Sequence, residues 1–264
     1  MNIKESIKEQ QNNGTKSMLI KNRLEKLFVE ERKTSDRYGL HASSIIEGEE
    51  KFCYRNQLLS LFYEQNQGQQ LPVSKLKIFS QGNATHEKWY KLFRAAEIDV
   101  AIERTLFLKK YDLSFTIDAI VNILGKHYIC DIKTMNTYQF QKMKKPSHPS
   151  GEKQINFYMW ALRQIEDKNI KEEINEGFVL IDDKNTQNIA IPIVEYNEEK
   201  NSIYIDRLKT IQEMKYDFLN NHIVPRRKCK DANCKRALEC NMRDCCWNIG
   251  IGRVKLAKEK RNRR

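Results

Sequence analysis

The sequence has no apolar run that approaches the ~20 residues needed to cross a bilayer, so no membrane-spanning helix is expected. The stretch MNIKESIKEQQNNG lacks the apolar segment of a secretory signal, which favours a cytoplasmic location. An internal repeat and an obvious domain linker are also missing, and 264 residues are enough to bury a sizeable core. We therefore predict a single domain over residues 1–264.

Acidic residues are in the minority, because 35 Asp and Glu stand against 47 Lys and Arg, for a net charge of +12. Such a surface attracts polyanions, most commonly nucleic acid or an anionic membrane. A basic protein kept soluble by its charge fits the same numbers. The excess is steepest in the last forty residues, which hold fourteen Lys and Arg against four Asp and Glu. That segment predicts a DNA-backbone track, or a solvated tail over its last ten residues.

The hydrophobic period changes from helical to alternating near residue 99. Helices are expected over about 44–65, with Cys53 inside, and over about 80–97. Strands are expected within 100–108, 113–123, 126–134, 177–182 and 188–196, with helices over 152–165 and about 198–221. This order predicts an α/β fold, with a central mixed sheet flanked by helices.

The second and third of these strands can form a hairpin that turns at Leu124–Gly125. Residues 118 and 131 are symmetric about that turn, so Asp118 and Asp131 would be cross-strand neighbours with Cβ atoms ~5 Å apart. Lys133 shares a face with Asp131, because side chains alternate along a strand. The opposite face is expected to be apolar and to take Ile117, Ala119, Val121, Cys130 and Ile132.

Two carboxylates this close repel each other unless a cation lies between them, and hard oxygen ligands suit Mg²⁺ or Mn²⁺. A metal there would activate a water molecule and stabilise charge on a phosphate. Lys133 would orient that water or stabilise the transition state. The alternative is an exposed hairpin face on which Asp118 and Asp131 both pair with Lys133 in solvent.

These residues resemble a known family. Asp118 followed by Asp131-Ile132-Lys133 resembles the D…(D/E)-x-K motif of the PD-(D/E)XK nuclease superfamily. Three further elements resemble its RecB-like exonuclease branch, namely Gly82…His86-Glu87 for G-x-x-x-H-E, Gln154…Tyr158 for Q-x-x-x-Y, and Pro146 with His148 in the preceding loop. The D-x-K triplet alone is weak, whereas four elements in this order are specific. The chain departs from the family at Phe115, where the family often has Gly.

The resemblance covers about residues 43–250 and implies a restriction-endonuclease-like core over about residues 75–222. It implies a Mg²⁺- or Mn²⁺-dependent deoxyribonuclease whose metal is held by His86, Asp118, Asp131 and the carbonyl of Ile132. The implied catalytic residues are Lys133, Asp131 and Asp118, with Gln154 and Tyr158 on one helix face.

CRISPR-adaptation nucleases and phage-type exonucleases belong to this branch. The implied substrate is therefore DNA, as single strands or free ends, in recombination, repair or phage DNA processing, with recombination or replication proteins as partners. The alternatives are a structure-selective endonuclease and a non-catalytic DNA-binding subunit.

Five of the seven cysteines fall within eighteen residues near the C-terminus, namely Cys229, Cys234, Cys240, Cys245 and Cys246. In a reducing cytoplasm such a cluster predicts metal binding rather than disulfides. The family resemblance implies a [4Fe–4S] cluster held by Cys53, Cys234, Cys240 and Cys246, with Cys229 as a substitute ligand and zinc as the alternative metal. This cluster would clasp residues 43–65 to residues 223–250, before a basic tail over 251–264. Cys130 is expected in the core.

Overall fold

The computed structural model describes residues 18, 20–23, 25–26, 39–63, 73–165 and 173–253. These residues belong to two compact units, one formed by 1–35 with 67–84 and the other by 36–66 with 85–264. In the first unit, Lys77 Nζ donates to Glu25 Oε1 at 3.0 Å. The second unit contains the sheet and all the predicted site residues from His86 onward. The basic tail beyond residue 253 lies outside the described residues.

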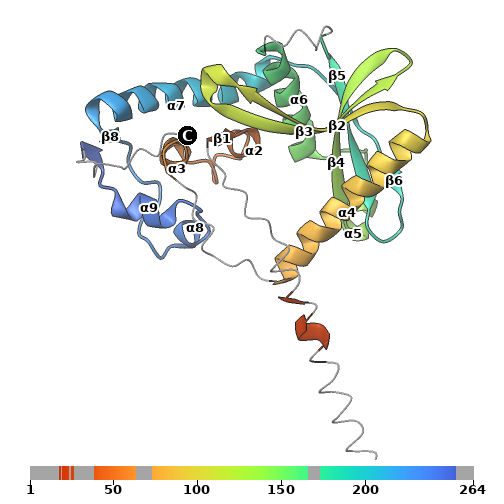
Figure 1. The fold of residues 1–264 in the computed structure, drawn as a ribbon, viewed down its shortest axis with the longest axis horizontal. Helices are drawn as coiled ribbons and strands as arrows, with labels where there is room; N and C mark the ends of the chain where they lie inside the picture. Colours follow the sequence, from red (N-terminus) through yellow and green to blue (C-terminus); the bar gives the residue numbers. More distant parts are fainter. Residues whose placement is uncertain are drawn as a thin grey trace, which may run out of the picture. The chain divides into compact units, whose positions relative to one another are not determined.

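Within the described residues, seven strands form one mixed sheet (Figure 1). They are β1 (Leu40–His41), β2 (Asp99–Leu108), β3 (Leu113–Ile123), β4 (Lys126–Met135), β5 (Glu176–Asp183), β6 (Ile189–Ala190) and β7 (Ile193–Glu195). β3 pairs antiparallel with β2 and β4 and parallel with β1. β4 runs parallel to β5, which pairs antiparallel with β6 and β7. The strand predicted over 188–196 is two short strands, because Pro192 between them cannot donate a ladder hydrogen bond.

The helices are α2 (Ala42–Ile45), α3 (Tyr54–Ser60), α4 (Val73–Ala95), α5 (Thr137–Gln141), α6 (Pro149–Arg163), α7 (Ser202–Asn221), α8 (Lys235–Leu238) and α9 (Arg243–Asn248), with 3₁₀ turns at Lys109–Tyr111 and Glu199–Asn201. A second small sheet pairs β8 (Ile223–Val224) with β9 (Gly252–Arg253). The helix predicted over 44–65 was wrong in its extent. A turn closed by Phe52 N–H on Gly48 O at 2.9 Å interrupts it, and Cys53 is extended, immediately before α3.

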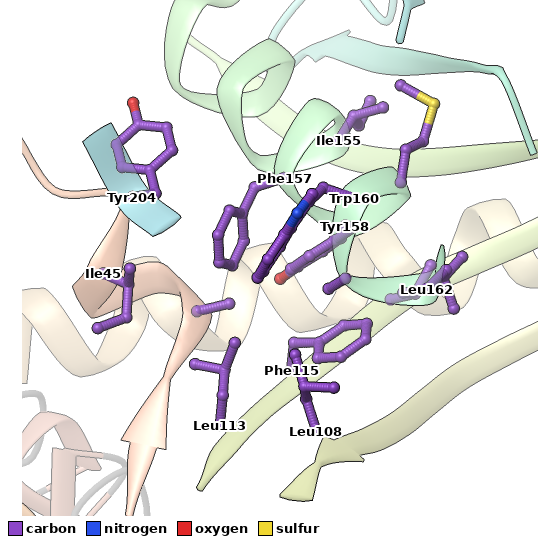
Figure 2. Close-up of a cluster of buried hydrophobic side chains, with 14 of the residues drawn as sticks. Ile45, Leu108, Leu113, Phe115, Ile155, Phe157, Tyr158, Trp160, Leu162 and Tyr204 are labelled. Atoms are coloured by element: carbon purple, nitrogen blue, oxygen red, sulfur yellow. The ribbon is translucent and has the colours of Figure 1, made fainter. Parts of the chain in front are cut away.

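The sheet of the second unit is buried on both faces. One face packs on α6, whose Phe157, Tyr158 and Trp160 extend toward Phe115 and the neighbouring strand residues in Figure 2. The other face carries Ala119, Val121, Cys130, Ile132, Phe178 and Leu180 and packs on Tyr90 and Phe93 of α4. Together the mixed sheet and the helices on both faces confirm the predicted α/β architecture. Cys130 is fully buried in this second layer, as expected for a core thiol.

β2 and β3 exchange faces part-way along their length. Phe115 and Ile117 pack on the α6 side, although Ala119 and Val121, at the same spacing, pack on the α4 side. The prediction that Ile117 shares a face with Ala119 was therefore wrong. The change falls where Glu103 of β2, with φ of 47°, interrupts the ladder between the pairs Ile102↔Ala119 and Arg104↔Ile117. Asp118 lies opposite this break. The direction of its carboxylate therefore depends on a local irregularity, which strict alternation of side chains along the strand does not predict.

Candidate active site

The hairpin of β3 and β4 closes through a two-residue turn. Leu124 and Gly125 have φ values of 53° and 81°, the left-handed pair of a type I′ turn. The pairing Ala119↔Cys130 puts Asp118 and Asp131 at the next position of the antiparallel register. The predicted register is therefore confirmed, and both carboxylates lie at the end of the hairpin that is distant from the turn.

Asp118 is held by the strand beside it. Its Oδ2 accepts a hydrogen bond from Ile132 N–H at 2.8 Å. The Ile132 carbonyl lies 3.1 Å from His86 Nε2, and His86 Nε2 lies 3.9 Å from Asp118 Oδ2. On the far side of the ring, Tyr90 Oη is 3.4 Å from His86 Nδ1. One turn of α4 thus places an imidazole nitrogen beside a strand carbonyl and a carboxylate, as predicted for His86, Ile132 and Asp118.

Asp131 is almost fully buried, with 1% of its surface exposed. Its Oδ1 accepts from Lys133 Nζ at 2.8 Å, whereas its Oδ2 has no hydrogen-bond partner. Burial raises the pKa of Asp131 to about 7, an effect that the Asp118 carboxylate reinforces and Lys133 opposes. A buried carboxylate oxygen without a donor is costly, and a cation beside it would remove that cost.

Lys133 starts a row of hydrogen bonds that ends in the core. Its ammonium lies 3.4 Å from Gln154 Oε1, and Gln154 Nε2 donates to Tyr158 Oη at 2.7 Å. Tyr158 stacks on Phe115, with ring centroids 5.3 Å apart (Figure 2). Gln154 and Tyr158 are i and i+4 on α6, so they share a face as predicted. The row fixes the Lys133 ammonium between a carboxylate and an amide. The alternative of a solvent-exposed hairpin face is wrong, because the Asp131 carboxylate that pairs with Lys133 is buried.

The residues around Asp118 have separations that suit a hard divalent cation. Adjacent ligands of an octahedral Mg²⁺ ion, each at about 2.1 Å, lie about 3 Å apart. The 3.1 Å between His86 Nε2 and the Ile132 carbonyl matches that spacing, and the 3.9 Å to Asp118 Oδ2 needs only a small movement. Among the described residues, however, no group of three His, Cys, Asp or Glu side chains is already gathered as a metal site. A divalent cation at this site would therefore also need the backbone carbonyl of Ile132 and the unpaired Oδ2 of Asp131 as ligands.

The profile of the PD-(D/E)XK nuclease superfamily matches residues 49–247, a span that includes Asp118 and the Asp131-Ile132-Lys133 triplet. The chain belongs to the PD-(D/E)XK nuclease superfamily. Members of this superfamily are generally nucleases, they typically use Mg²⁺ or Mn²⁺, and their fold implies DNA as the substrate. The expected metal-dependent nuclease is thus supported at the level of the superfamily.

The PD-(D/E)XK chain is also similar to a solved structure titled "Crystal structure of SSO0001". The two chains share 16% identity with a TM-score of 0.43, and the match covers 74% of this chain and 86% of the other. A comparison with curated proteins gave no match. Across the described residues, none of the helices is both long and apolar enough to cross a membrane.

The thiols of the PD-(D/E)XK chain gather between α3 and the C-terminal segment. Burial raises the pKa of Cys229 to about 11, and the nearby thiols of Cys234, Cys240 and Cys53 add to this rise. Backbone amides, first that of Ala237, lower the pKa of Cys234. Cys53 thus lies near Cys229, which is more than 170 residues later in the chain. Among the described residues, however, no three cysteines are close enough together to form a metal site as they stand.

Several basic residues of the C-terminal segment donate hydrogen bonds to backbone carbonyls. Arg236 donates to the carbonyls of residues 50–52, and Lys228 to those of Glu49 and Phe52. Arg227 donates to Cys246 O and Ile249 O, and Arg243 to Ala232 O. Sequence reasoning missed these roles, since charge counts do not show which cations hold carbonyls. These four basic residues thus help to hold the C-terminal segment in place. The predicted DNA-backbone track would have to be formed by the other basic residues of the segment.

Proposed function

We propose that the chain is a Mg²⁺- or Mn²⁺-dependent exonuclease that hydrolyses phosphodiester bonds in single-stranded DNA or at DNA ends. The proposal rests chiefly on one observation: the unpaired, buried Oδ2 of Asp131 lies in a carboxylate whose other oxygen holds the Lys133 ammonium. A cation and an ordered ammonium are what a phosphoryl-transfer site needs to balance the charge of the transition state. The resemblance to the RecB-like branch supports action on strands and ends, in recombination, repair or phage DNA processing.

In this proposal His86, Asp118, Asp131 and the Ile132 carbonyl hold the metal. A bound Mg²⁺ or Mn²⁺ ion would supply an acidified water and neutralise negative charge on the phosphate. His86 binds through its Nε2 lone pair when its proton is on Nδ1, the nitrogen that faces the Tyr90 hydroxyl. Lys133, positioned by Asp131 and Gln154, orients the attacking water or stabilises charge on the phosphate oxygens.

The function is tested with end-labelled single- and double-stranded DNA in Mn²⁺. We expect mononucleotides or short products to accumulate from one labelled end of the single strand, because an exonuclease releases products from a terminus. Chelation with EDTA should stop the reaction. Cuts at internal junctions would favour the structure-selective endonuclease instead. Binding without cleavage, in the presence of metal, would favour the non-catalytic DNA-binding subunit.

We also propose that the thiols hold a [4Fe–4S] cluster through Cys53, Cys234, Cys240 and Cys246, with Cys229 as the substitute and zinc as the alternative metal. N–H donors support this choice, because Arg55 Nε donates to Cys246 Sγ at 3.1 Å and Asn56 Nδ2 to Cys240 Sγ at 3.2 Å. Such donors stabilise thiolates, the form that binds metal.

The identity of the thiol-bound metal is tested on protein purified without oxygen. We expect iron and sulfide in the chain, a broad absorbance band near 400 nm, as is typical of such clusters, and loss of both in Cys246→Ser. Cys245→Ser is the matched control, since it removes the neighbouring cysteine that the proposed ligand set omits. Stoichiometric zinc with no iron would instead establish the zinc alternative.

A further inference from the structure

Arg55 is among the most deeply buried side chains of the described residues, with 1% of its surface exposed. It lies in α3, two residues after Cys53, yet all its hydrogen bonds go to the C-terminal segment. Nη1 donates to Pro225 O at 2.7 Å, and Nη2 donates to Cys246 O, Ile249 O and Gly250 O at 2.7–2.9 Å. Nε donates to the sulfur of Cys246 at 3.1 Å.

The guanidinium has no carboxylate among these partners. Four of the five acceptors are neutral carbonyl oxygens, and the fifth is a thiol sulfur. A buried positive charge is strongly unfavourable unless an opposite charge lies next to it. The sulfur of Cys246 is the group in direct contact that can carry negative charge. Through this contact the buried guanidinium touches one of the proposed metal ligands directly.

We propose that Arg55 is the counter-cation of this thiol centre, and that it couples occupancy of the centre to attachment of residues 223–253 on α3. The inference rests on the metal-bound thiol centre proposed above. Four cysteine thiolates around zinc or a [4Fe–4S] core carry net negative charge, which the Arg55 guanidinium faces through Nε. The same guanidinium holds carbonyls at both ends of the segment, from Pro225 to Gly250. Without the metal centre, the guanidinium lacks this counter-charge and the attachment weakens.

A neighbouring arginine provides a matched control. Arg227 donates to two of the same carbonyls, Cys246 O at 3.1 Å and Ile249 O at 2.7 Å, and stacks on Trp247. None of its hydrogen bonds reaches a sulfur. Arg227→Met thus removes two of the backbone hydrogen bonds that hold this segment and leaves the sulfur contact of Arg55 in place, whereas Arg55→Met removes four backbone hydrogen bonds and that sulfur contact. Arg55→Lys keeps the positive charge and loses most of the carbonyl contacts.

The experiment measures iron and zinc per chain in anaerobically purified full-length wild type, Arg55→Met, Arg55→Lys and Arg227→Met. Thermolysin cleavage within residues 223–253 is followed before and after metal removal by a chelator, which is dialysed away before the protease is added. We expect Arg55→Met to retain metal about 10- to 100-fold more weakly than wild type, as is usual when a group next to a metal ligand is lost. Arg55→Lys should recover part of the loss, and Arg227→Met should stay near wild type. In wild type, metal removal should open the segment to thermolysin.

Two results would overturn the role of Arg55 while the thiol centre stands. One is full metal content in Arg55→Met; the other is an equal loss in Arg55→Met and Arg227→Met, which would make Arg55 a backbone anchor alone. Should Arg55→Met fail to fold, Arg55→Gln replaces it as the uncharged variant, because a higher metal content in Arg55→Lys than in Arg55→Gln supports the charge role and an equal or lower one opposes it. Wild type that holds neither iron nor zinc would refute the thiol centre itself.

Discussion

Lys133→Ala is expected to reduce DNA cleavage in Mn²⁺ by about 100- to 1,000-fold, the usual cost of losing one group that stabilises transition-state charge. The ammonium is held in place by Asp131 Oδ1 at 2.8 Å and by Gln154 Oε1 at 3.4 Å, so the alanine variant loses an ordered charge. Its loss also removes the charge that opposes the rise in the pKa of Asp131. The proton should then compete better with metal, and the Mn²⁺ concentration for half-maximal cleavage should increase. Initial rates over a Mn²⁺ titration measure both effects.

The matched control for this variant is Lys126→Ala. Lys126 begins the same strand and also pairs with an acidic residue, Glu176 at 2.6 Å, but that ion pair is on the surface. Surface ion pairs contribute little to stability, so this variant should fold and cleave as wild type does. Equal cleavage by Lys133→Ala and wild type would show that the site is elsewhere or that the activity is a contaminant. Binding of DNA by Lys133→Ala, followed by fluorescence anisotropy, should persist.

Gly151→Ala is expected to reduce cleavage by about 100-fold, because small displacements of catalytic groups have effects of this size. A Cβ at position 151 would lie 2.8 Å from Asp131 Oδ2 and 3.0 Å from Val179 Cγ2. The first turn of α6 must then move away from β4, or the Asp131 carboxylate must turn. The gain of about 1 kcal/mol from replacing a helical Gly is offset by an overpacking cost of about 1–3 kcal/mol. Stability should therefore change little while Mn²⁺ affinity falls.

Thermal unfolding with and without Mn²⁺ separates these two quantities. Wild type should gain thermal stability when Mn²⁺ binds, because a ligand that binds only the native state stabilises it. Gly151→Ala should show a smaller gain at the same Mn²⁺ concentration. Ser150→Ala, at the exposed position one residue earlier in the same helical turn, adds no atoms and should behave as wild type. A Gly151→Ala protein with unchanged Mn²⁺ response and unchanged cleavage would mean that the close approach of α6 is not needed by the site.

The hairpin of β3 and β4 and the functional face of α6 could be predicted from the sequence alone. A two-residue turn at Leu124–Gly125 fixes which residues face each other, so the position of Asp118 opposite Asp131 follows from counting. The spacing of Gln154 and Tyr158 likewise fixes a shared helix face, which the hydrogen bond between them uses. These features depend on residues close together in the chain, where backbone geometry leaves few choices.

The environment of those residues depends on tertiary packing and could not be predicted in this way. The burial of Asp131, the approach of Gly151 and the contact of His86 with the Ile132 carbonyl join segments far apart in the sequence. The face change at Glu103 comes from a left-handed residue inside an apparently regular strand. Arg55 reaches residues more than 160 positions later in the chain. A one-dimensional pattern records which residues are polar or apolar, but the packing of distant elements determines which charges are buried and what neutralises them.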